Sequence, residues 1–219
     1  MTFPLYVFDA YGTLFDVHSA VARCRSLIGP EADRLSDLWR AKQLEYSWTR
    51  SLMGAHRDFR ALTEDGLDFA AARCGGVSAE ARAALLSAYE TLDAYADVAP
   101  ALKALKARGA RLVILSNGTP AMLASAVRSA GLSDLLDESL SVEEAGVFKT
   151  DARAYALVEK RYGVTPQQVS FQSSNRWDIA GATKFGFRCV WINRAAAPDE
   201  YADLAPAAVL PGLQRLLDL

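Results

Sequence analysis

The chain of 219 residues is 51 % hydrophobic and 23 % charged, the balance of an ordinary globular protein with room for one core and a small accessory domain. Its net charge of −2 argues against non-specific binding to nucleic acid or to an anionic membrane. No apolar run is long enough to cross a bilayer. We therefore expect no nucleic acid and no membrane among the partners of this protein.

Short apolar runs rich in Val, Ile and Phe alternate with amphipathic stretches over most of the chain. They predict β-strands at residues 5–8, 112–115, 139–142 (the weakest run), 169–171 and 189–192. Strands that alternate with helices favour a parallel sheet covered on both faces. We therefore predict an α/β fold with a Rossmann-like parallel sheet as its core.

The segment from residue 17 to residue 95 interrupts this alternation with helical patterns and no convincing strand. Leu35, Leu38, Trp39 and Tyr46 fall at helical spacing, and Ser78 is placed to cap a helix over residues 79–92. We predict a helical cap domain at residues 17–95, inserted after the first strand. The core domain is then formed by residues 1–16 and 96–219.

Polar side chains follow the predicted strands at the edge where ligands bind in an open parallel sheet. Taken singly, Ser116-Asn117-Gly118 fits a turn, and Asp178 fits a helix N-terminal acid. Together the groups come from four segments distant in sequence: Asp9, Tyr11, Thr13, Ser116, Asn117, Lys149, Ser173, Ser174, Asn175 and Asp178. Their convergence at one sheet edge indicates an active site.

The motifs DAYGT, SNG, the late lysine and SSNRWD occur in the order found in the haloacid dehalogenase (HAD) superfamily, which the chain resembles over nearly its whole length. The stretches FDAYGTLFD, LWRAKQLEYSW, LSNG, FKTDARAY and SSNRWD resemble its (S)-2-haloacid dehalogenase family in particular. The resemblance implies the HAD fold and the hydrolysis of (S)-2-haloalkanoic acids to (R)-2-hydroxyalkanoic acids with inversion. It also implies a homodimer.

The acids that a magnesium-dependent phosphatase of this superfamily needs are incomplete here. Tyr11 stands where a phosphatase has its general acid, and Ser173-Ser174 stand where it has Gly-Asp. The remaining carboxylates, Asp9 and Asp178, are expected to face the Lys149 ammonium, which can hold both without a metal. We therefore expect no metal and no cofactor, and a site built for an organic electrophile.

The predicted mechanism begins with attack of the Asp9 carboxylate on C2 of a 2-haloacid, which expels halide and leaves an ester of Asp9. Water then hydrolyses this ester, with Asp178 as general base or water orienter and Ser173 and Asn175 in support. Thr13 and Lys149 complete the catalytic set around Asp9.

Substrate-binding residues are carried over from the family by position. Arg40 and Asn117 match the residues that receive the halide, and Ser116 matches the serine that holds the substrate carboxylate. Apolar walls are expected from Tyr11, Leu44 and Trp177, and Tyr155 matches a tyrosine near the lysine. For Trp177 a packing role in the core remains open.

Several features stay outside these assignments. Thr150 stands where the family often has proline, while Gln172 and Arg176 flank the SSN motif and either alter substrate size or point away from the site.

His18 and His56 are predicted to be structural or on the surface. Cys24, Cys74 and Cys189 form no CxxC pair, and the N-terminal sequence lacks a signal peptide pattern, so we expect free thiols and a cytoplasmic protein.

Two alternatives remain beside the dehalogenase. The first is a phosphatase of the same superfamily, which magnesium dependence would reveal. The second is a degenerate member that binds a carboxylate or a partner without turnover, which the complete set of Asp9, Lys149, Arg40 and Asp178 disfavours.

Overall fold

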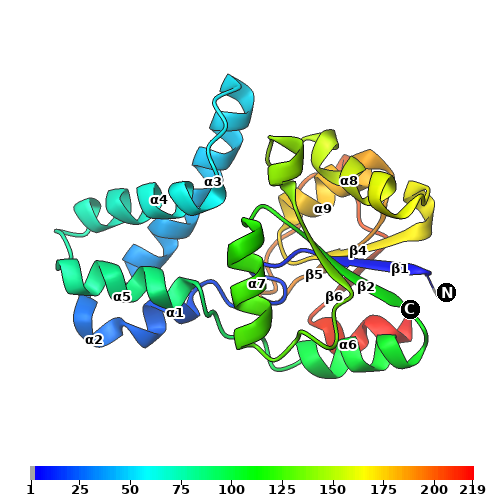
Figure 1. Ribbon diagram of the computed structural model, residues 1–219, viewed down its shortest axis with the longest axis horizontal. Helices are drawn as coiled ribbons and strands as arrows, with labels where there is room; N and C mark the ends of the chain where they lie inside the picture. The colour runs from blue at the N-terminus through cyan, green and yellow to red at the C-terminus, as the bar shows by residue number, and fades with distance from the viewer. Residues whose placement is uncertain (1–2) are drawn as a thin grey trace.

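The computed structural model describes residues 3–219, so Met1 and Thr2, on which part of the signal-peptide expectation rests, lie outside the described residues. Its core is one parallel sheet of six strands in the order β3-β2-β1-β4-β5-β6 (Figure 1). The strands are β1 (Leu5–Phe8), β2 (Arg111–Ser116), β3 (Glu138–Ser141), β4 (Val169–Ser173), β5 (Arg188–Ile192) and β6 (Ala208–Leu210). The predicted α/β class and all five predicted strands are confirmed.

The sixth strand, β6, was not predicted from the sequence. It is three residues long, lies at the sheet edge beside β5, and exposes 52 % of Val209. An edge strand this short and this exposed carries too few apolar residues to stand out as a buried run.

The central strand β1 is paired on both sides, and this pairing places the start of the site. Val7 lies opposite Val113 of β2 and Phe171 of β4, and all residues of β1 are buried. The ladder continues one residue further, because the Asp9 amide donates to the Gln172 carbonyl at 2.9 Å. Asp9 therefore leaves the sheet at the point where the strand order reverses, the usual ligand-binding position of such folds.

Four helices pack on the sheet: α6 (Val98–Ala107), α7 (Pro120–Ser129), α8 (Ala152–Tyr162) and α9 (Arg176–Phe185). Helices α8 and α9 cover one face, and α6 with the C-terminal turn Leu213–Asp218 covers the other (Figure 1). Helix α7 is capped by Thr119, whose hydroxyl accepts from the Met122 amide at 3.2 Å, and has Pro120 as its first residue.

Between residues 17 and 95 the described chain forms helices: α1 (Ser19–Arg23), α2 (Arg25–Ile28), α3 (Ala32–Met53), α4 (Phe59–Arg73) and α5 (Ala79–Tyr89). Figure 1 shows them to one side of the sheet. Ser78 caps α5 by accepting from the Ala81 amide at 3.1 Å, as predicted. The helix ends at Tyr89 rather than Leu92, where Arg23 binds the carbonyls of Ala88 and Thr91. The domain boundaries at residues 17 and 95 stay a prediction.

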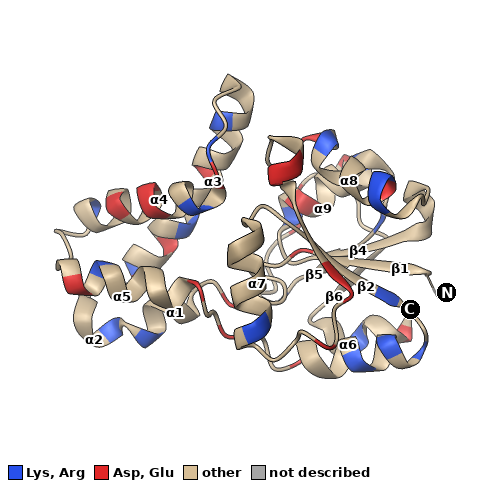
Figure 2. Ribbon diagram, in the orientation of Figure 1, with Lys and Arg blue, Asp and Glu red and all other residues tan. Residues whose placement is uncertain are grey.

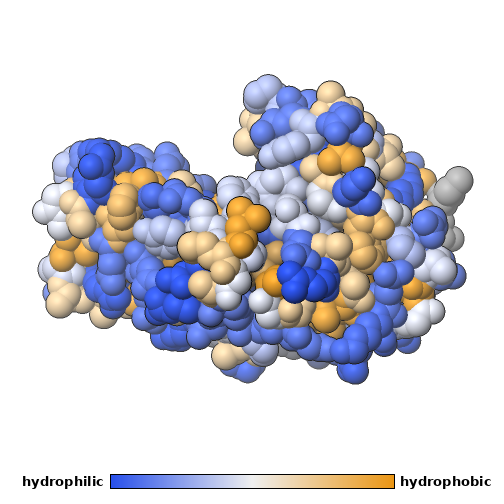
Figure 3. All heavy atoms as spheres, turned by 90° about the horizontal axis from the view of Figure 1, so that it is seen from above, coloured by the Kyte–Doolittle hydropathy of each residue, from blue (hydrophilic) through white to orange (hydrophobic). Residues whose placement is uncertain are grey.

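Charges of both signs are spread over the helices on the sheet and over the inserted helices (Figure 2). Apolar atoms appear on the surface as separate small patches (Figure 3). Across residues 3–219, the helices are too short or too polar for any of them to span a membrane.

Candidate functional site

The three charged residues predicted to meet at the sheet edge do so. The Lys149 ammonium lies 3.0 Å from Asp9 Oδ1 and 2.8 Å from Asp178 Oδ2. Lys149 is 1 % exposed, Asp9 5 % and Asp178 0 %. Burial lowers the pKa of Lys149, but the Asp178 and Asp9 carboxylates outweigh this effect, so its pKa is raised and the side chain stays an ammonium.

The second oxygen of Asp9 is held by neutral donors. Asn175 Nδ2 donates to Asp9 Oδ2 at 2.8 Å, the Thr13 hydroxyl at 3.0 Å and the Ser173 hydroxyl at 3.4 Å. Thr13 in turn accepts from the Ser174 amide at 2.8 Å, which ties the end of β1 to the end of β4. These contacts hold the Asp9 carboxylate in one orientation, as a nucleophile requires.

Asp178 lies in the first turn of α9 and is fully buried. Tyr155 donates from its hydroxyl to Asp178 Oδ1 at 2.8 Å, while Lys149 binds the other carboxylate oxygen. Burial raises the pKa of Asp178 to about 6, against the opposing charge of Lys149. Burial also raises the pKa of Tyr155 well above its ordinary value, so the phenol remains a donor. A carboxylate with a pKa near 6 is suited to accept a proton from water.

The predicted Ser116-Asn117 pair lies at the end of β2, next to this cluster. Asn117 Oδ1 accepts from the Lys149 backbone amide at 3.0 Å, which fixes the segment carrying the lysine. The Ser116 hydroxyl accepts from the Gly118 amide at 3.2 Å, ahead of the N-terminus of α7. Halide binding by Asn117 and carboxylate binding by Ser116 remain predictions.

Arg40 reaches the core from α3. Its Nη2 atom lies 3.4 Å from the Tyr11 carbonyl oxygen and 3.5 Å from Asn175 Oδ1, so its guanidinium is beside the residues that hold Asp9. Both distances are long for charged hydrogen bonds. The arginine is thus within reach of the site while retaining donors for an anion.

Tyr11 is buried and packs among aromatic rings. Its ring stacks on Tyr89 at 5.6 Å between centroids and lies 5.8 Å from Phe59. A Cβ atom on Gly118 would come within 2.7 Å of the Tyr11 ring, so the close approach requires glycine there. Burial raises the pKa of Tyr11 well above its ordinary value, which leaves it a neutral phenol.

Sequence reasoning missed Tyr89 and Phe59 as neighbours of the site. Tyr89 ends α5 and Phe59 begins α4, and aromatic residues on amphipathic helices ordinarily signal core packing. Gln43 of α3 is buried beside them. It donates to the Thr63 hydroxyl at 2.9 Å, and the Tyr89 hydroxyl donates to it at 3.4 Å. This buried network lies directly behind Tyr11.

Two of the three departures from the family pattern, Arg176 and Gln172, have side chains with partners other than Asp9. Arg176 is buried and donates to Asp199 at 2.7 Å and to the carbonyls of Tyr201 and Leu204. Gln172 donates to the Ser170 hydroxyl at 2.7 Å within the sheet. Of the two alternatives for these residues, pointing away from the site is therefore the one observed. The Lys149–Thr150 peptide bond is cis.

The two histidines have local contacts outside this cluster. The exposed His18 shares a 2.7 Å hydrogen bond with the Ser36 hydroxyl, and His56 packs on Phe148 with centroids 5.0 Å apart. All three cysteines, Cys24, Cys74 and Cys189, are free thiols.

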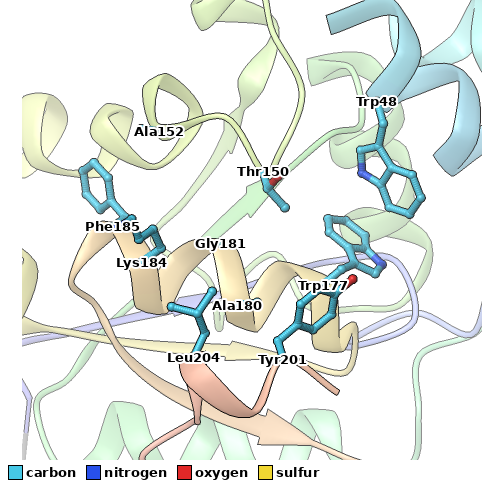
Figure 4. Close-up of a pocket in the computed structure, with 10 residues that line it drawn as sticks. All are labelled: Trp48, Thr150, Ala152, Trp177, Ala180, Gly181, Lys184, Phe185, Tyr201 and Leu204. Atoms are coloured by element: carbon cyan, nitrogen blue, oxygen red, sulfur yellow. The ribbon is translucent and has the colours of Figure 1, made fainter. Parts of the chain in front are cut away.

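A hollow of about 630 Å³ runs along the outer side of α9 (Figure 4). Trp177 lines it and meets Trp48 of α3 edge to face, with centroids 5.3 Å apart. Its other lining residues are Thr150, Ala152, Ala180, Gly181, Lys184, Phe185, Tyr201 and Leu204. Leu44 is half-buried on α3, one turn after Arg40. The roles of Trp177 and Leu44 as walls for an alkyl group stay predictions.

The donor set does not fit a magnesium ion between the two carboxylates. The Lys149 ammonium is within hydrogen-bond distance of both Asp9 and Asp178, where a bridging cation would have to bind. The nearby side chains Ser173, Asn175 and Thr13 are neutral donors to Asp9, whereas magnesium prefers carboxylate oxygens and water. No group of three or more His, Cys, Asp or Glu suited to a metal occurs within residues 3–219.

The chain matches a known family of hydrolases. The family model of the haloacid dehalogenase-like hydrolases matches residues 3–186. The chain is 47 % identical to (S)-2-haloacid dehalogenase 1 of Pseudomonas sp. (strain CBS-3), over 97 % of this chain and 94 % of that protein.

Two solved structures share the whole fold. An L-2-haloacid dehalogenase crystal structure superposes with a TM-score of 0.96 at 43 % identity, covering 100 % of this chain and 98 % of the other. The L-2-haloacid dehalogenase from Xanthobacter autotrophicus, solved with chloropropionic acid covalently bound, gives a TM-score of 0.89 at 36 % identity, covering 99 % and 98 %.

Proposed function

Since the chain belongs to the (S)-2-haloacid dehalogenases, hydrolases that act on carbon–halide bonds, we propose that it converts (S)-2-haloalkanoic acids into (R)-2-hydroxyalkanoic acids. The observation that carries this proposal is the buried Asp9 carboxylate, which Lys149 and three neutral donors hold in one orientation. A carboxylate fixed in this way is suited to attack a saturated carbon rather than to bind a metal.

In the first step an Asp9 oxygen attacks C2 of the substrate from the side opposite the halogen. The new bond joins that oxygen to C2, while the carbon–halogen bond breaks and the halide leaves with its electron pair. A single displacement at C2 inverts its configuration. The relative with covalently bound chloropropionic acid supports an intermediate of this kind.

The charges that develop in this step need donors. We assign the departing halide to Arg40 and Asn117; the guanidinium 3.5 Å from Asn175 Oδ1, and the contact of Asn117 with the Lys149 amide, support this by their nearness to the residues that hold Asp9. Arginine suits this role because it stays ionised in a closed pocket. Ser116 and the backbone amides ahead of α7 are suited to the substrate carboxylate.

In the second step water attacks the carbonyl carbon of the Asp9 ester. Asp178 accepts a proton from this water, the bond between the Asp9 carbonyl carbon and the ester oxygen breaks, and the leaving alkoxide takes that proton back from Asp178. Asp9 returns as a carboxylate after one proton passes to solvent. The pKa of about 6 for Asp178 and the hydrogen bond from Tyr155 support its assignment as the base.

We propose that neither step needs a metal, because Lys149 supplies the positive charge between Asp9 and Asp178.

We also propose that the helices of residues 17–95 form a cap domain that carries Arg40 to the site. A homodimer is proposed as well: Leu52 and Met53, at the end of α3, expose 88 % and 67 % of their surface. The free cysteines agree with a cytoplasmic location.

The test is halide release from (S)- and (R)-2-chloropropanoate, each with EDTA and with added magnesium. We expect release from the (S) form only, unchanged by EDTA. Release that requires magnesium would contradict the metal-free site. No release from either enantiomer, followed by magnesium-dependent hydrolysis of phosphate esters, would establish the phosphatase instead, and no turnover of either class would favour a binding protein.

A further inference from the structure

The chain crosses between the sheet and the inserted helices twice, and the two crossings lie side by side. The Asp16 amide donates to the Asp93 carbonyl at 2.8 Å, and the Tyr95 amide donates to the Leu14 carbonyl at 3.0 Å. Phe15 and Ala94 form an antiparallel bridge between them. Any movement of the inserted helices against the sheet must therefore pass through this short paired segment.

Arg194, just after β5, contacts both crossings. Its Nη2 atom donates to the Thr13 carbonyl on the outward crossing, and its Nη1 atom donates to Asp97 Oδ2 on the returning one, each at 3.0 Å. Its guanidinium also lies 4.1 Å from the centroid of the Tyr95 ring. The Arg194 and Asp97 side chains are only 18 % and 15 % exposed, so solvent screens this ion pair less than an open surface pair.

The Asp97 end of the Arg194–Asp97 ion pair is held by the core. Asp97 Oδ2 also accepts from the Leu213 amide at 2.7 Å, which belongs to the C-terminal turn packed on α6. Asp97 thus binds both Arg194 and the Leu213 amide, and through it Arg194 links the crossings to the C-terminal turn of the core.

Two groups of the proposed reaction depend on what Arg194 holds. Thr13 donates to Asp9 Oδ2 at 3.0 Å, and its carbonyl is the one that Arg194 binds. Arg40 is carried by α3, beyond the crossings, and its own contacts with Tyr11 and Asn175 are long, at 3.4 and 3.5 Å. Its place therefore depends on the position of α3, which also meets the core where the Trp48 ring packs on Trp177 and where the Ser51 hydroxyl accepts from the Phe148 amide at 3.0 Å.

We propose that Arg194 is a positioning residue that sets the cap over the sheet and thereby places Arg40 against Asp9 and the departing halide. This inference rests on the proposed dehalogenase function. It assigns no contact between Arg194 and the substrate; the residue acts through Thr13, Tyr95 and Asp97.

The first test compares Arg194→Ala and Arg194→Lys with the wild type in halide release from (S)-2-chloropropanoate. We expect kcat to fall by about 10- to 100-fold in Arg194→Ala, because a displacement of about 1 Å in a reacting group costs up to about 100-fold. KM should change less, and Arg194→Lys should recover part of kcat. Asp97→Asn, which keeps an acceptor for Leu213 but removes the charge, should lower kcat less than Arg194→Ala.

Arg188→Ala is the matched control, because Arg188 begins the same strand and also lies over an aromatic ring, that of Phe3. It contacts neither crossing in the described structure, and we expect wild-type kcat. Equal losses in Arg188→Ala and Arg194→Ala would assign the effect to general destabilisation of β5.

A double-mutant cycle with Arg40→Lys separates positioning from plain structural support. If Arg194 acts by placing Arg40, adding Arg194→Ala to Arg40→Lys should cost less than about threefold, because interacting residues are non-additive. Losses that multiply fully would overturn the proposal.

Hydrogen exchange gives a readout that does not depend on turnover. The amides of Asp16 and Tyr95 should exchange faster in Arg194→Ala and Arg194→Lys, while those of β1 and β4 stay protected. Unchanged exchange at the crossings would contradict the proposal even if activity fell. A wild-type protein that releases no halide would contradict the proposed function, whereas an active wild type with unaffected Arg194 variants would contradict only the role of Arg194.

Discussion

The Lys149 ammonium lies 3.0 Å from Asp9 Oδ1, with both side chains almost fully removed from solvent. An ion pair this deeply buried stabilises a fold weakly or not at all, because desolvation offsets much of the attraction. Together with the neutral donors to Oδ2, the pair fixes the orientation of the Asp9 carboxylate, as the proposed nucleophile requires. Asp178 completes the cluster on the other side of the same ammonium.

Replacing Lys149 with Met should abolish halide release and destabilise the fold. The variant leaves the Asp9 and Asp178 carboxylates buried without their cation, and breaking such a pair costs about 3–5 kcal/mol. The free energy of unfolding in urea measures this loss. The control is Lys160→Met, which removes an exposed partner of Glu144 and should change the free energy of unfolding by less than about 1 kcal/mol. Equal losses in the two variants would contradict the account.

The rate of ester hydrolysis should fall as the pH drops below about 6, the pKa to which burial raises Asp178. Protonated Asp178 cannot accept the proton of water. The pH profile of kcat checks this, with Asp178→Asn as the variant that should lose turnover and accumulate the Asp9 ester. A flat profile through pH 6 would remove Asp178 from the role of base.

The raised pKa of Asp178 also predicts how the stability of the protein changes with pH. Its pKa is raised in the folded state from 3.8 to about 6, so the folded protein binds this proton more tightly than the unfolded chain. The contribution of Asp178 to stability is therefore fully present below pH 3.8 and is lost as the pH rises through about 6. The free energy of unfolding in urea, taken as the wild-type value minus the Asp178→Asn value, should decline in this way as the pH rises. A difference that grows with pH would contradict the prediction.

Tyr11→Phe should keep most of the activity. Burial raises the pKa of Tyr11 well above its ordinary value, and its ring packs on Tyr89 and Phe59, so we expect the ring rather than the hydroxyl to matter. Tyr155→Phe should instead lower kcat by about tenfold or more, because it removes the hydrogen bond to Asp178. A loss of about 100-fold in Tyr11→Phe would show that its hydroxyl transfers a proton.

Asn175→Asp should lower kcat by about 100-fold or more. The change replaces the 2.8 Å donor to Asp9 with a third carboxylate that repels it, while the shape of the side chain is kept. Steady-state kinetics and thermal unfolding, measured together, separate loss of catalysis from loss of fold. A variant that retains wild-type kcat would show that Asn175 does not hold the nucleophile.

The parts of the fold that the sequence predicted are those with local signals. The apolar run at β1 and the cap residue Ser78 each depend on a few neighbouring residues, and each is observed. Asp9 and Asp178 likewise follow two paired strands and converge at their ends, whereas the expectation that Lys149 lies between them followed the family resemblance.

Other features depend on tertiary contacts that no local pattern reveals. The end of α5 at Tyr89 depends on Arg23, which is distant in sequence. Phe59 and Tyr89 become neighbours of Tyr11 only once the inserted helices pack. The burial of Arg176 depends on the carbonyls of a loop that bends back over α9, and neither partner is recognisable beforehand.

The most direct test of Asp9 as the nucleophile is a single turnover in water labelled with a heavy oxygen isotope, with enzyme in excess over (S)-2-chloropropanoate. If the Asp9 carboxylate attacks C2, the first product carries unlabelled hydroxyl oxygen, and mass spectrometry finds the label in the peptide that contains Asp9. If water attacks C2 directly, the first product carries the label and the peptide does not, which would contradict the mechanism.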